Sequence, residues 1–338
     1  MTLYELFDEA VRQAASDIHL ADGETPWLRV AGDLVPVDLV PVDGAIPPLR
    51  ELLQPLLTPE GLARLGAGLT VEKTIVHGEL AFVGIVFRVG EGNLAATFRI
   101  LQKTIPPLDF IAQGALPLFE KLIKTTRGLI LVVGPTGSGK WTVGWSMVDA
   151  INEVKGARIF VLENHPSFHY ASKKSLVTAL HVGHDCESYE SALSTILQAD
   201  LDVVAMDDIP TFEALRRALT LADTGHLVIA NLHASSPADA VERLVASAGS
   251  EADALRRSLA QNLVAVTAQR LLPGKEKGRV AAYEYVVNTP AVRAALISGD
   301  DLAEVQASDP ECRTLNGALD EMVAAGRVTE EVAAAHRE

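Results

Sequence analysis

The sequence predicts an α/β protein with two domains, of which the second contains a mainly parallel β-sheet. Two observations carry this prediction. A chain of 338 residues is too long for one ordinary core. From Gly128 onward, apolar runs such as "GLILVVG" and "GHLVIANLH" alternate with helical patterns such as "TFEALRRALTLA". Strands that are apolar throughout are typical of a parallel sheet buried on both faces, and such a sheet binds ligands at the carboxyl ends of its strands.

The first domain is expected over residues 1–102 and has a mixed α+β pattern. It begins with an amphipathic helix, "MTLYELFDEAVRQ", followed by two short strands around a Gly-Asp turn in "PWLRVAGDLVPV". The segment "AIPPLRELLQPLLTPEGLARL" is predicted to form one helix. Strands in "TVEKTIVHGELAFVGIVFRV" and "LAATFRIL" flank a hairpin turn at "GEGN". Residues 103–115 contain two prolines and are predicted to form a linker.

The second domain is expected over residues 116–338. Besides the two apolar runs above, "ARIFVLEN" and "LDVVAMDD" are predicted strands, and each ends in polar residues. From Pro237 onward the pattern predicts a mostly helical region. Within it, "NTPAVRAALISG" is predicted to form an amphipathic helix after a proline start.

Composition excludes several classes of protein. The net charge is -15 and no long basic run offsets it, which argues against binding to nucleic acid or to an anionic membrane surface. No apolar run reaches about 18 residues, so no direct membrane insertion is expected. Cys186 and Cys312 form no disulfide framework or metal-ligand pattern. Together with an N-terminus that lacks a basic leader, these features favour a cytoplasmic location.

The clearest motif is a phosphate-binding loop in "LVVGPTGSGKWT". Its Gly-x-x-x-x-Gly-Lys spacing follows a predicted buried strand and precedes a helical pattern, which favours nucleotide binding over a glycine-rich turn with a surface lysine. The glycines allow successive N–H groups to point at phosphate oxygens, and Lys140 supplies positive charge. The predicted nucleotide-binding residues are Gly134, Pro135, Thr136, Gly137, Ser138, Gly139, Lys140, Trp141 and Thr142.

The loop departs from its pattern at Trp141. A Ser or Thr at this position normally places its hydroxyl on Mg²⁺, whereas an indole has no oxygen and its N–H only donates. Thr142 lies about 100° further around a helix and is not expected to substitute without rearrangement. The sequence therefore predicts a retained phosphate site with a weakened magnesium site.

With this loop in place, the chain resembles the PilT family of type IV pilus retraction ATPases, within the wider type II secretion ATPase group. The resemblance runs nearly end to end. The segments that carry it are "ASDIHL", "RVAGDL", "HVGHD", "DTGHLVIANLHASSPADAVERL", "TAQRLLP", "AAYEYVVNTPAVRAALISG" and "TLNGALDEMVAAGRVTEE".

The resemblance implies a PAS-like α+β N-terminal domain followed by a RecA-like P-loop domain, assembled into a hexameric ring. It further implies a cytoplasmic ATPase subunit acting in pilus retraction and twitching motility. Its implied partners are further copies of itself or a paralogous pilus ATPase in a mixed ring, and an inner-membrane pilus assembly platform protein.

Two acidic motifs of the family are altered. After "RIFVLE" the family usually continues with Asp and Pro, but here Glu163 is followed by Asn164, which neither binds Mg²⁺ with charge nor acts as a base. The family's second acidic strand usually ends in Gly-Glu, and here it ends in Asp207 and Asp208. Asp208 stands where Glu is expected, and we predict that it contacts the metal. The alternative is that both aspartates are ordinary strand-end carboxylates facing solvent.

The family's arginines and histidines complete the predicted site. The resemblance assigns Arg99 to a catalytic arginine, with a surface ion pair as the alternative. "FVGIV" stands where the family has an Arg-Phe-Arg strand, and the register of Arg88 stays open. His226 and His233 resemble the family's histidine box, with His233 near the phosphates and His226 equally well a core histidine. The predicted catalytic residues are Glu163, Asp208, His233 and Arg99.

Two hypotheses remain open from the sequence. In the first, the chain is a pilus retraction ATPase that binds ATP and hydrolyses it weakly. In the second, it is a catalytically inactive subunit that regulates or scaffolds a motor ring. The metal hydroxyl, one carboxylate and one arginine element have changed at the same site, which favours binding with little or no hydrolysis.

Overall fold

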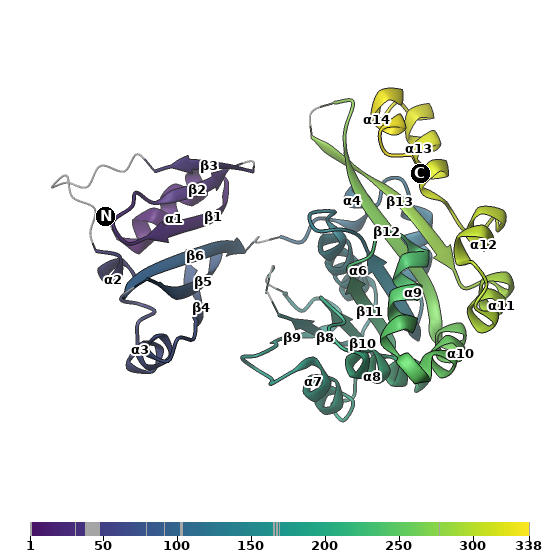
Figure 1. Ribbon diagram of the computed structural model, residues 1–338, viewed down its shortest axis with the longest axis horizontal. Coiled ribbons are helices and arrows are strands. Elements are labelled where there is room, and N and C mark those ends of the chain that lie inside the picture. Colours follow the sequence, from purple (N-terminus) through teal and green to yellow (C-terminus); the bar gives the residue numbers. More distant parts are fainter. Residues whose placement is uncertain are drawn as a thin grey trace. The chain divides into compact units, whose positions relative to one another are not determined.

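The structure is a computed structural model that describes residues 2–30, 32–37, 48–78, 80–90, 92–101, 104–164, 166, 168, 170–276 and 278–337. The chain consists of two compact units, unit 1 (Met1–Thr104 and Pro166–His169) and unit 2 (Ile105–His165 and Tyr170–Glu338). Figure 1 shows both units with their helices and strands labelled. No helix within the described ranges is long and apolar enough to cross a membrane.

Unit 1 is a six-stranded antiparallel sheet with short helices, as the α+β prediction requires. Its strand order is β3-β2-β1-β6-β5-β4, and every pairing is antiparallel. The strands are β1 (Ala15–Ala21), β2 (Trp27–Val30), β3 (Asp33–Pro36), β4 (Val71–His77), β5 (Leu80–Val89) and β6 (Asn93–Leu101). The predicted turn between β5 and β6 includes Glu91, which lies outside the described residues.

The amphipathic helix at the N-terminus is confirmed as α1 (Leu3–Arg12). Thr2 and Glu5 cap it reciprocally, since each side chain accepts a hydrogen bond from the other residue's backbone N–H. The apolar face of α1 packs on the sheet, where the Phe7 ring stacks on Phe82 with centroids 3.9 Å apart. This contact forms the centre of the core of unit 1.

The single helix predicted over "AIPPLRELLQPLLTPEGLARL" is wrong. Its described part forms two helices, α2 (Leu49–Leu52) and α3 (Pro59–Gly66). Pro55 has no N–H to continue α2, and the Thr58 hydroxyl accepts a hydrogen bond from Gly61 N, which starts α3 as a separate helix. The segment before Pro48 in that prediction lies outside the described residues.

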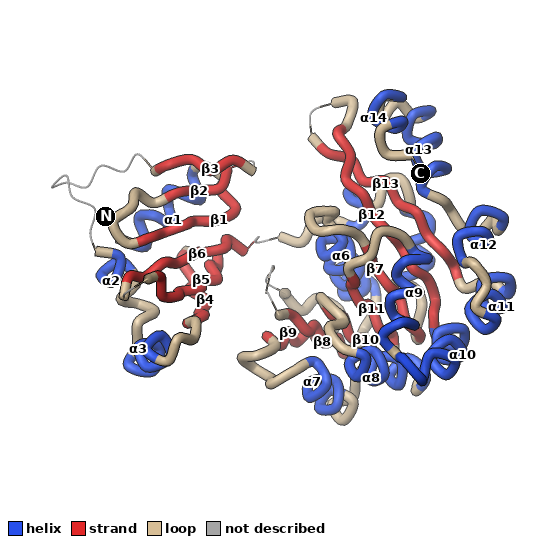
Figure 2. The backbone as a smooth tube through the Cα atoms, viewed as in Figure 1, coloured by secondary structure: helices blue, strands red, loops and turns tan. Residues whose placement is uncertain are grey.

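Unit 2 contains a seven-stranded sheet in the order β13-β12-β7-β11-β10-β8-β9. All neighbours are parallel except β12 and β13, so the prediction of a mainly parallel sheet is confirmed. The strands are β7 (Gly128–Val133), β8 (Arg158–Glu163), β9 (Leu176–His181), β10 (Val203–Met206), β11 (Leu227–Leu232), β12 (Leu263–Pro273) and β13 (Arg279–Val287). Figure 2 shows this sheet in red between its helices.

The hairpin of β12 and β13 corrects the prediction of a mostly helical region after Pro237. The eleven residues of β12 pair with β7 on one side and with β13 on the other. Most of β12 is buried, and its buried residues include the polar Thr267 and Gln269, so its sequence lacks a clear alternating pattern. The edge strand β9 was also not predicted.

Helices cover the sheet of unit 2. They are α4 (Leu108–Ile111), α5 (Leu116–Leu122), α6 (Lys140–Val154), α7 (Tyr189–Ile196), α8 (Phe212–Asp223), α9 (Pro237–Ser247), α10 (Ala252–Asn262), α11 (Pro290–Ser298), α12 (Leu302–Ser308), α13 (Leu315–Ala324) and α14 (Glu330–Ala334), with a short 3₁₀ turn at Gly249–Glu251. The boundary between the units falls after Thr104, and α4, which lies within the predicted linker, belongs to unit 2.

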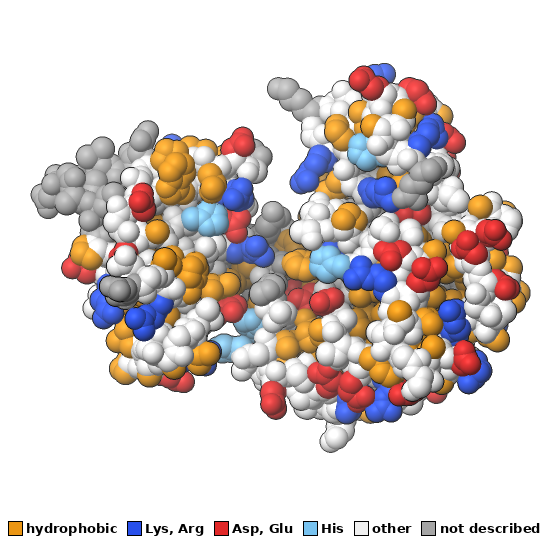
Figure 3. Space-filling model, viewed as in Figure 1, with side chains coloured by type: hydrophobic (Ala, Val, Ile, Leu, Met, Phe, Trp, Pro, Cys, Tyr) orange, Lys and Arg blue, Asp and Glu red, His pale blue; other side chains and the backbone are white. Residues whose placement is uncertain are grey.

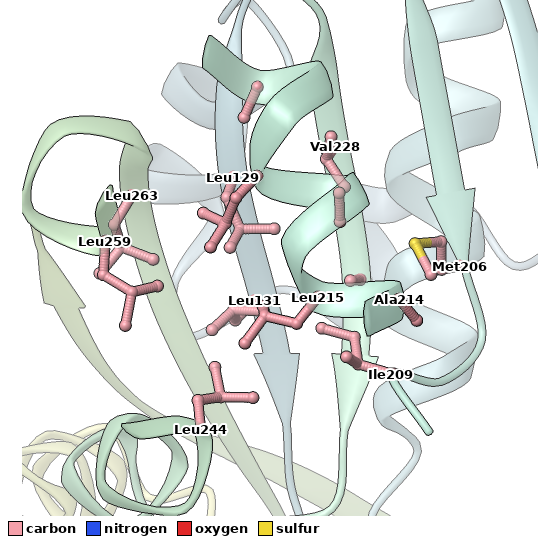
Figure 4. Close-up of a cluster of buried hydrophobic side chains, with 14 of the residues drawn as sticks. Leu129, Leu131, Met206, Ile209, Ala214, Leu215, Val228, Leu244, Leu259 and Leu263 are labelled. Carbon is pink, nitrogen blue, oxygen red and sulfur yellow. The ribbon is translucent and has the colours of Figure 1, made fainter. Parts of the chain in front are cut away.

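The main core of unit 2 lies between the sheet and α8. Leu129 and Leu131 of β7 point toward Leu215 of α8, and Val228 of β11 lies beside them (Figure 4). The alternate residues of β7 point to the opposite face, and α6 also contacts β7. Acidic and basic side chains are interspersed over the visible face of this unit (Figure 3).

Candidate phosphate-binding site

The carboxyl ends of three neighbouring strands carry the candidate site. The Gly134–Thr142 loop follows β7, Asp207 and Asp208 follow β10, and His233 follows β11. Since these strands are parallel and adjacent, their ends meet at one edge of the sheet. The structure brings Lys140, Asp208 and His233 together there.

The loop has the backbone of a phosphate cradle. Gly137 and Gly139 adopt φ of +78° and +83°, which glycine adopts without strain. Gly134 is required for a different reason, which is lack of space: a Cβ there would lie 2.4 Å from Ser138 Oγ and 2.7 Å from Gln269 O. The helix α6 begins directly after Gly139 and has no side-chain cap, so its N-terminal dipole faces the loop.

Two further observations describe the space and the polar groups that this loop offers to a ligand. The buried Ser138 Oγ has no hydrogen-bond partner among the described residues. Pro135, Thr136 and Gly137 at the tip are exposed, and nothing lies within 4 Å of a Cβ built on Gly137. The cradle therefore offers an unpartnered hydroxyl inside and open space at its tip.

Lys140 is the cation of the cradle, although it is only 4% exposed. Its ammonium Nζ lies 3.4 Å from Pro135 O and 3.2 Å from His233 Nδ1. Burial lowers the pKa of Lys140, and the negative charge of Asp208 opposes that shift. Because an ammonium only donates, His233 Nδ1 accepts this hydrogen bond and the imidazole is neutral.

Trp141 occupies the position of the usual metal-binding hydroxyl. The Lys140 ammonium lies 5.6 Å from the centroid of its ring, within the range of a cation–π contact. The indole Nε1 is buried and has no hydrogen-bond partner in the part of the chain that the structure describes. Magnesium needs oxygen ligands, so this side chain does not fit it. The described residues also contain no cluster of three or more His, Cys, Asp or Glu that fits a metal ion.

Glu163 is a buried carboxylate at the end of β8, only 2% exposed. The Tyr170 hydroxyl donates a hydrogen bond to its Oε1 at 2.8 Å. Burial and the Glu163 charge raise the pKa of Tyr170 far above its usual range. The edge of the Trp145 ring packs against Tyr170, with centroids 6.0 Å apart. Glu163 is therefore held inside the protein by contacts that the sequence did not indicate.

The two aspartates after β10 have different environments. Asp207 is 4% exposed, accepts a hydrogen bond from the Tyr189 hydroxyl, and accepts another from Asn164 N at 2.8 Å. The alternative of a solvent-facing carboxylate is thus wrong for Asp207. Asp208 is half-buried, accepts a hydrogen bond from Ile209 N at 2.9 Å, and acts on the pKa of both Lys140 and His233.

The two histidines also differ. The ring of His226 bonds at Nδ1 to Leu221 O at 3.0 Å, which is the structural role that the sequence left open. Much of His233 is exposed, but partial desolvation lowers its pKa and the charge of Lys140 adds to this shift. His233 contacts the loop through Lys140, whereas His226 contacts Leu221 and Thr224.

Arg99 lies in unit 1, where it is directly opposite Asp17 across the β1–β6 pair. Its Nε lies 3.4 Å from Asp17 Oδ1, and the arginine side chain is 53% exposed. This is the surface ion pair that the sequence allowed as an alternative. The assignment of Arg99 as a catalytic residue stays a prediction.

Gln269 is a further residue of the site that the sequence did not single out. Its side-chain Nε2 lies 3.0 Å from the position that a Cβ on Gly139 would take, and its carbonyl lies behind Gly134. Gln269 lies in the segment "TAQRLLP", which was not recognised from its sequence as a strand next to the loop.

A family model described as type II/IV secretion system protein matches residues 87–334. The type IV pilus retraction ATPase PilT of Pseudomonas aeruginosa is 32% identical over 338 residues, covering 98% of this chain and 96% of that protein. The chain belongs to the PilT family of type II/IV secretion system proteins.

Two further comparisons agree with this assignment. The uncharacterized protein YggR of Escherichia coli is 35% identical over 303 residues, covering 86% of this chain and 88% of that protein. A crystal structure of the pilus retraction motor PilT with bound ADP matches with a TM-score of 0.89 at 31% identity, covering 98% of this chain and 96% of that chain. The predicted fold, a RecA-like P-loop domain preceded by a smaller PAS-like α+β domain, is thereby confirmed.

Proposed function

We propose that the chain is a nucleotide-binding subunit of a type IV pilus retraction motor that binds ATP and hydrolyses it weakly or not at all. The observation that carries this proposal is the combination of an intact cradle with Trp141 at the metal position. Its PilT relative is described as a retraction ATPase, and the similar PilT structure contains ADP.

The binding step uses the loop and Lys140. Backbone N–H groups at the start of α6 and the unpartnered Ser138 hydroxyl would hold phosphate oxygens. Lys140 would exchange its contacts with Pro135 and His233 for the phosphates. His233, neutral and next to Lys140, is placed to contact the terminal phosphate.

The same residues are poorly suited to hydrolyse ATP. Magnesium supplies charge neutralisation when bound in this kind of site, and Asp208 is the carboxylate here that would contact it. Trp141 offers it no oxygen, so the magnesium site is weakened. Glu163 is only 2% exposed and accepts a hydrogen bond from the Tyr170 hydroxyl, so a water molecule has little access to this carboxylate.

The second candidate function is a regulatory or scaffolding subunit that does not hydrolyse ATP. The buried Glu163–Tyr170 pair and the replacement of the metal hydroxyl favour it. In either case we propose a cytoplasmic ring, formed by copies of this chain or with a paralogous pilus ATPase, that works on an inner-membrane pilus assembly platform protein.

Binding of a fluorescent ATP analogue to the purified chain tests the proposal. Lys140→Ala is expected to weaken binding at least tenfold, because it removes a charge-assisted contact of about 1.5–3 kcal/mol. Lys155→Ala is the matched control, since Lys155 lies at the opposite end of α6 and its substitution is expected to leave binding unchanged. Equal binding by the parent and Lys140→Ala would contradict the proposal.

A further inference from the structure

The charge balance of the site differs from that of a magnesium-dependent one. Trp141 supplies no oxygen ligand, and its ring instead contacts the Lys140 ammonium at 5.6 Å. Asp208 is half-buried beside the same lysine, and its charge acts on the pKa of Lys140 and of His233. In the part of the chain that the structure describes, the ammonium group on which Asp208 acts is that of Lys140.

His233 adds no positive charge that would balance the Asp208 carboxylate. Its Nδ1 accepts a hydrogen bond from Lys140 at 3.2 Å, so the imidazole is in the neutral form with its proton on Nε2. The other cation that acts on this histidine is Arg243, which is exposed on α9. A bound phosphate would therefore compete with Asp208 and His233 for Lys140.

A diphosphate and a triphosphate bring different amounts of negative charge to this site. The loop amides, the Ser138 hydroxyl and Lys140 are the groups that would bind a diphosphate. A third phosphate brings one more negative charge and must share Lys140 with Asp208. Without a divalent cation between them, the carboxylate and the terminal phosphate repel each other.

We propose that this site selects a nucleoside diphosphate, bound without a divalent cation, over a nucleoside triphosphate. This inference rests on the proposed nucleotide-binding function and deepens it. It makes the chain a subunit that holds the product state of its active relatives.

Isothermal titration calorimetry of the full chain tests this with ADP and ATP, each in magnesium and in EDTA. ADP is expected to bind about tenfold tighter than ATP, the scale of one like-charge interaction in a half-buried site. Replacing magnesium by EDTA is expected to change ADP affinity less than about threefold, because no metal ligand is lost. Magnesium-bound ATP that binds tighter than ADP would overturn the inference and leave nucleotide binding intact. Absence of binding by either nucleotide would instead refute the proposed function.

Asp208→Asn identifies the cause of the selectivity. The amide oxygen keeps the acceptor for Ile209 N, so folding is expected to persist, and circular dichroism checks this. The variant is expected to bind ATP more tightly and to close most of the gap to ADP. The matched control is Asp223→Asn at the end of α8, which precedes β11 and so lies at the opposite end of that strand from His233; it is expected to keep the parent's ratio. A folded Asp208→Asn that keeps the full preference for ADP would overturn the repulsion argument.

Discussion

At the scale of single residues, the sequence predicted the parts of the site that depend on spacing. The glycines and Lys140 are fixed relative to one another by the loop motif, and Asp208 and His233 follow neighbouring strands. Tyr170 and Tyr189 were not predicted. Each acts on a carboxylate at the end of a strand, and nothing in the spacing of a tyrosine shows which buried carboxylate it meets.

We expect Trp141 to determine how strongly magnesium affects ATP affinity. In Trp141→Ser a hydroxyl replaces the indole at the start of α6, where it is expected to bind magnesium together with Asp208. Magnesium is then expected to raise ATP affinity about tenfold over EDTA, which corresponds to ~1.4 kcal/mol. Calorimetry in the two buffers measures this ratio.

Trp27→Ser is the control for that substitution. It also replaces a tryptophan by serine, but on the partly exposed β2 of unit 1, so magnesium is expected to have no effect on its ATP affinity. If Trp141→Ser behaves like Trp27→Ser, Trp141 is not the cause of the weakened metal site.

At the scale of elements, strands that are apolar throughout were recognised, and the strands β7, β8, β10 and β11 all appear where predicted. The hairpin of β12 and β13 was missed because β12 contains Thr267 and Gln269, polar residues buried beside β7 and the loop. A long strand with buried polar residues shows neither a period of two nor an apolar run. The broken helix at Pro55 was missed because apolar spacing outweighed the proline.

The link between α7 and β10 is expected to stabilise this edge of the sheet. Tyr189→Phe removes the hydroxyl that donates to the buried Asp207 carboxylate. Loss of one donor to a buried charged group is expected to lower the free energy of unfolding by about 1–3 kcal/mol. Urea denaturation followed by circular dichroism measures this. Tyr4→Phe, at a tyrosine that is 41% exposed, is expected to shift the midpoint little, and equal shifts would contradict the role of Tyr189.

At the scale of the whole molecule, the chain has two units that each carry their own core, and the sequence predicted both from length and from the change of pattern along the chain. Charge also acts at this scale. A net charge of -15 favours solubility and disfavours contact with nucleic acid. The candidate site itself is nevertheless built around one lysine, since spacing and not overall charge determines a phosphate loop.

Three buried tyrosines are expected to make the protein sensitive to alkali. Burial raises the pKa of Tyr170, Tyr189 and Tyr283, with nearby carboxylates adding to the first two. A raised folded-state pKa means that stability is complete below the unfolded value of about 10 and is lost as pH rises above it. Each tyrosine is expected to contribute a slope of up to ~1.4 kcal/mol per pH unit.

Guanidinium midpoints at pH 9 and pH 11 measure this effect. The midpoint of the parent is expected to fall over that interval. The midpoint of Tyr283→Phe is expected to fall less, because this variant lacks one of the three tyrosine hydroxyl groups. A midpoint that is independent of pH would contradict the burial of these hydroxyl groups.

The central claim is that the chain keeps a phosphate cradle and has lost the metal chemistry of its active relatives. Steady-state ATP turnover, measured in magnesium with the purified chain and with Lys140→Ala in parallel, tests it most directly. We predict that the parent turns over ATP weakly or not at all above the rate of Lys140→Ala, although the parent binds nucleotide. Fast magnesium-dependent turnover by the parent that Lys140→Ala abolishes would contradict the account.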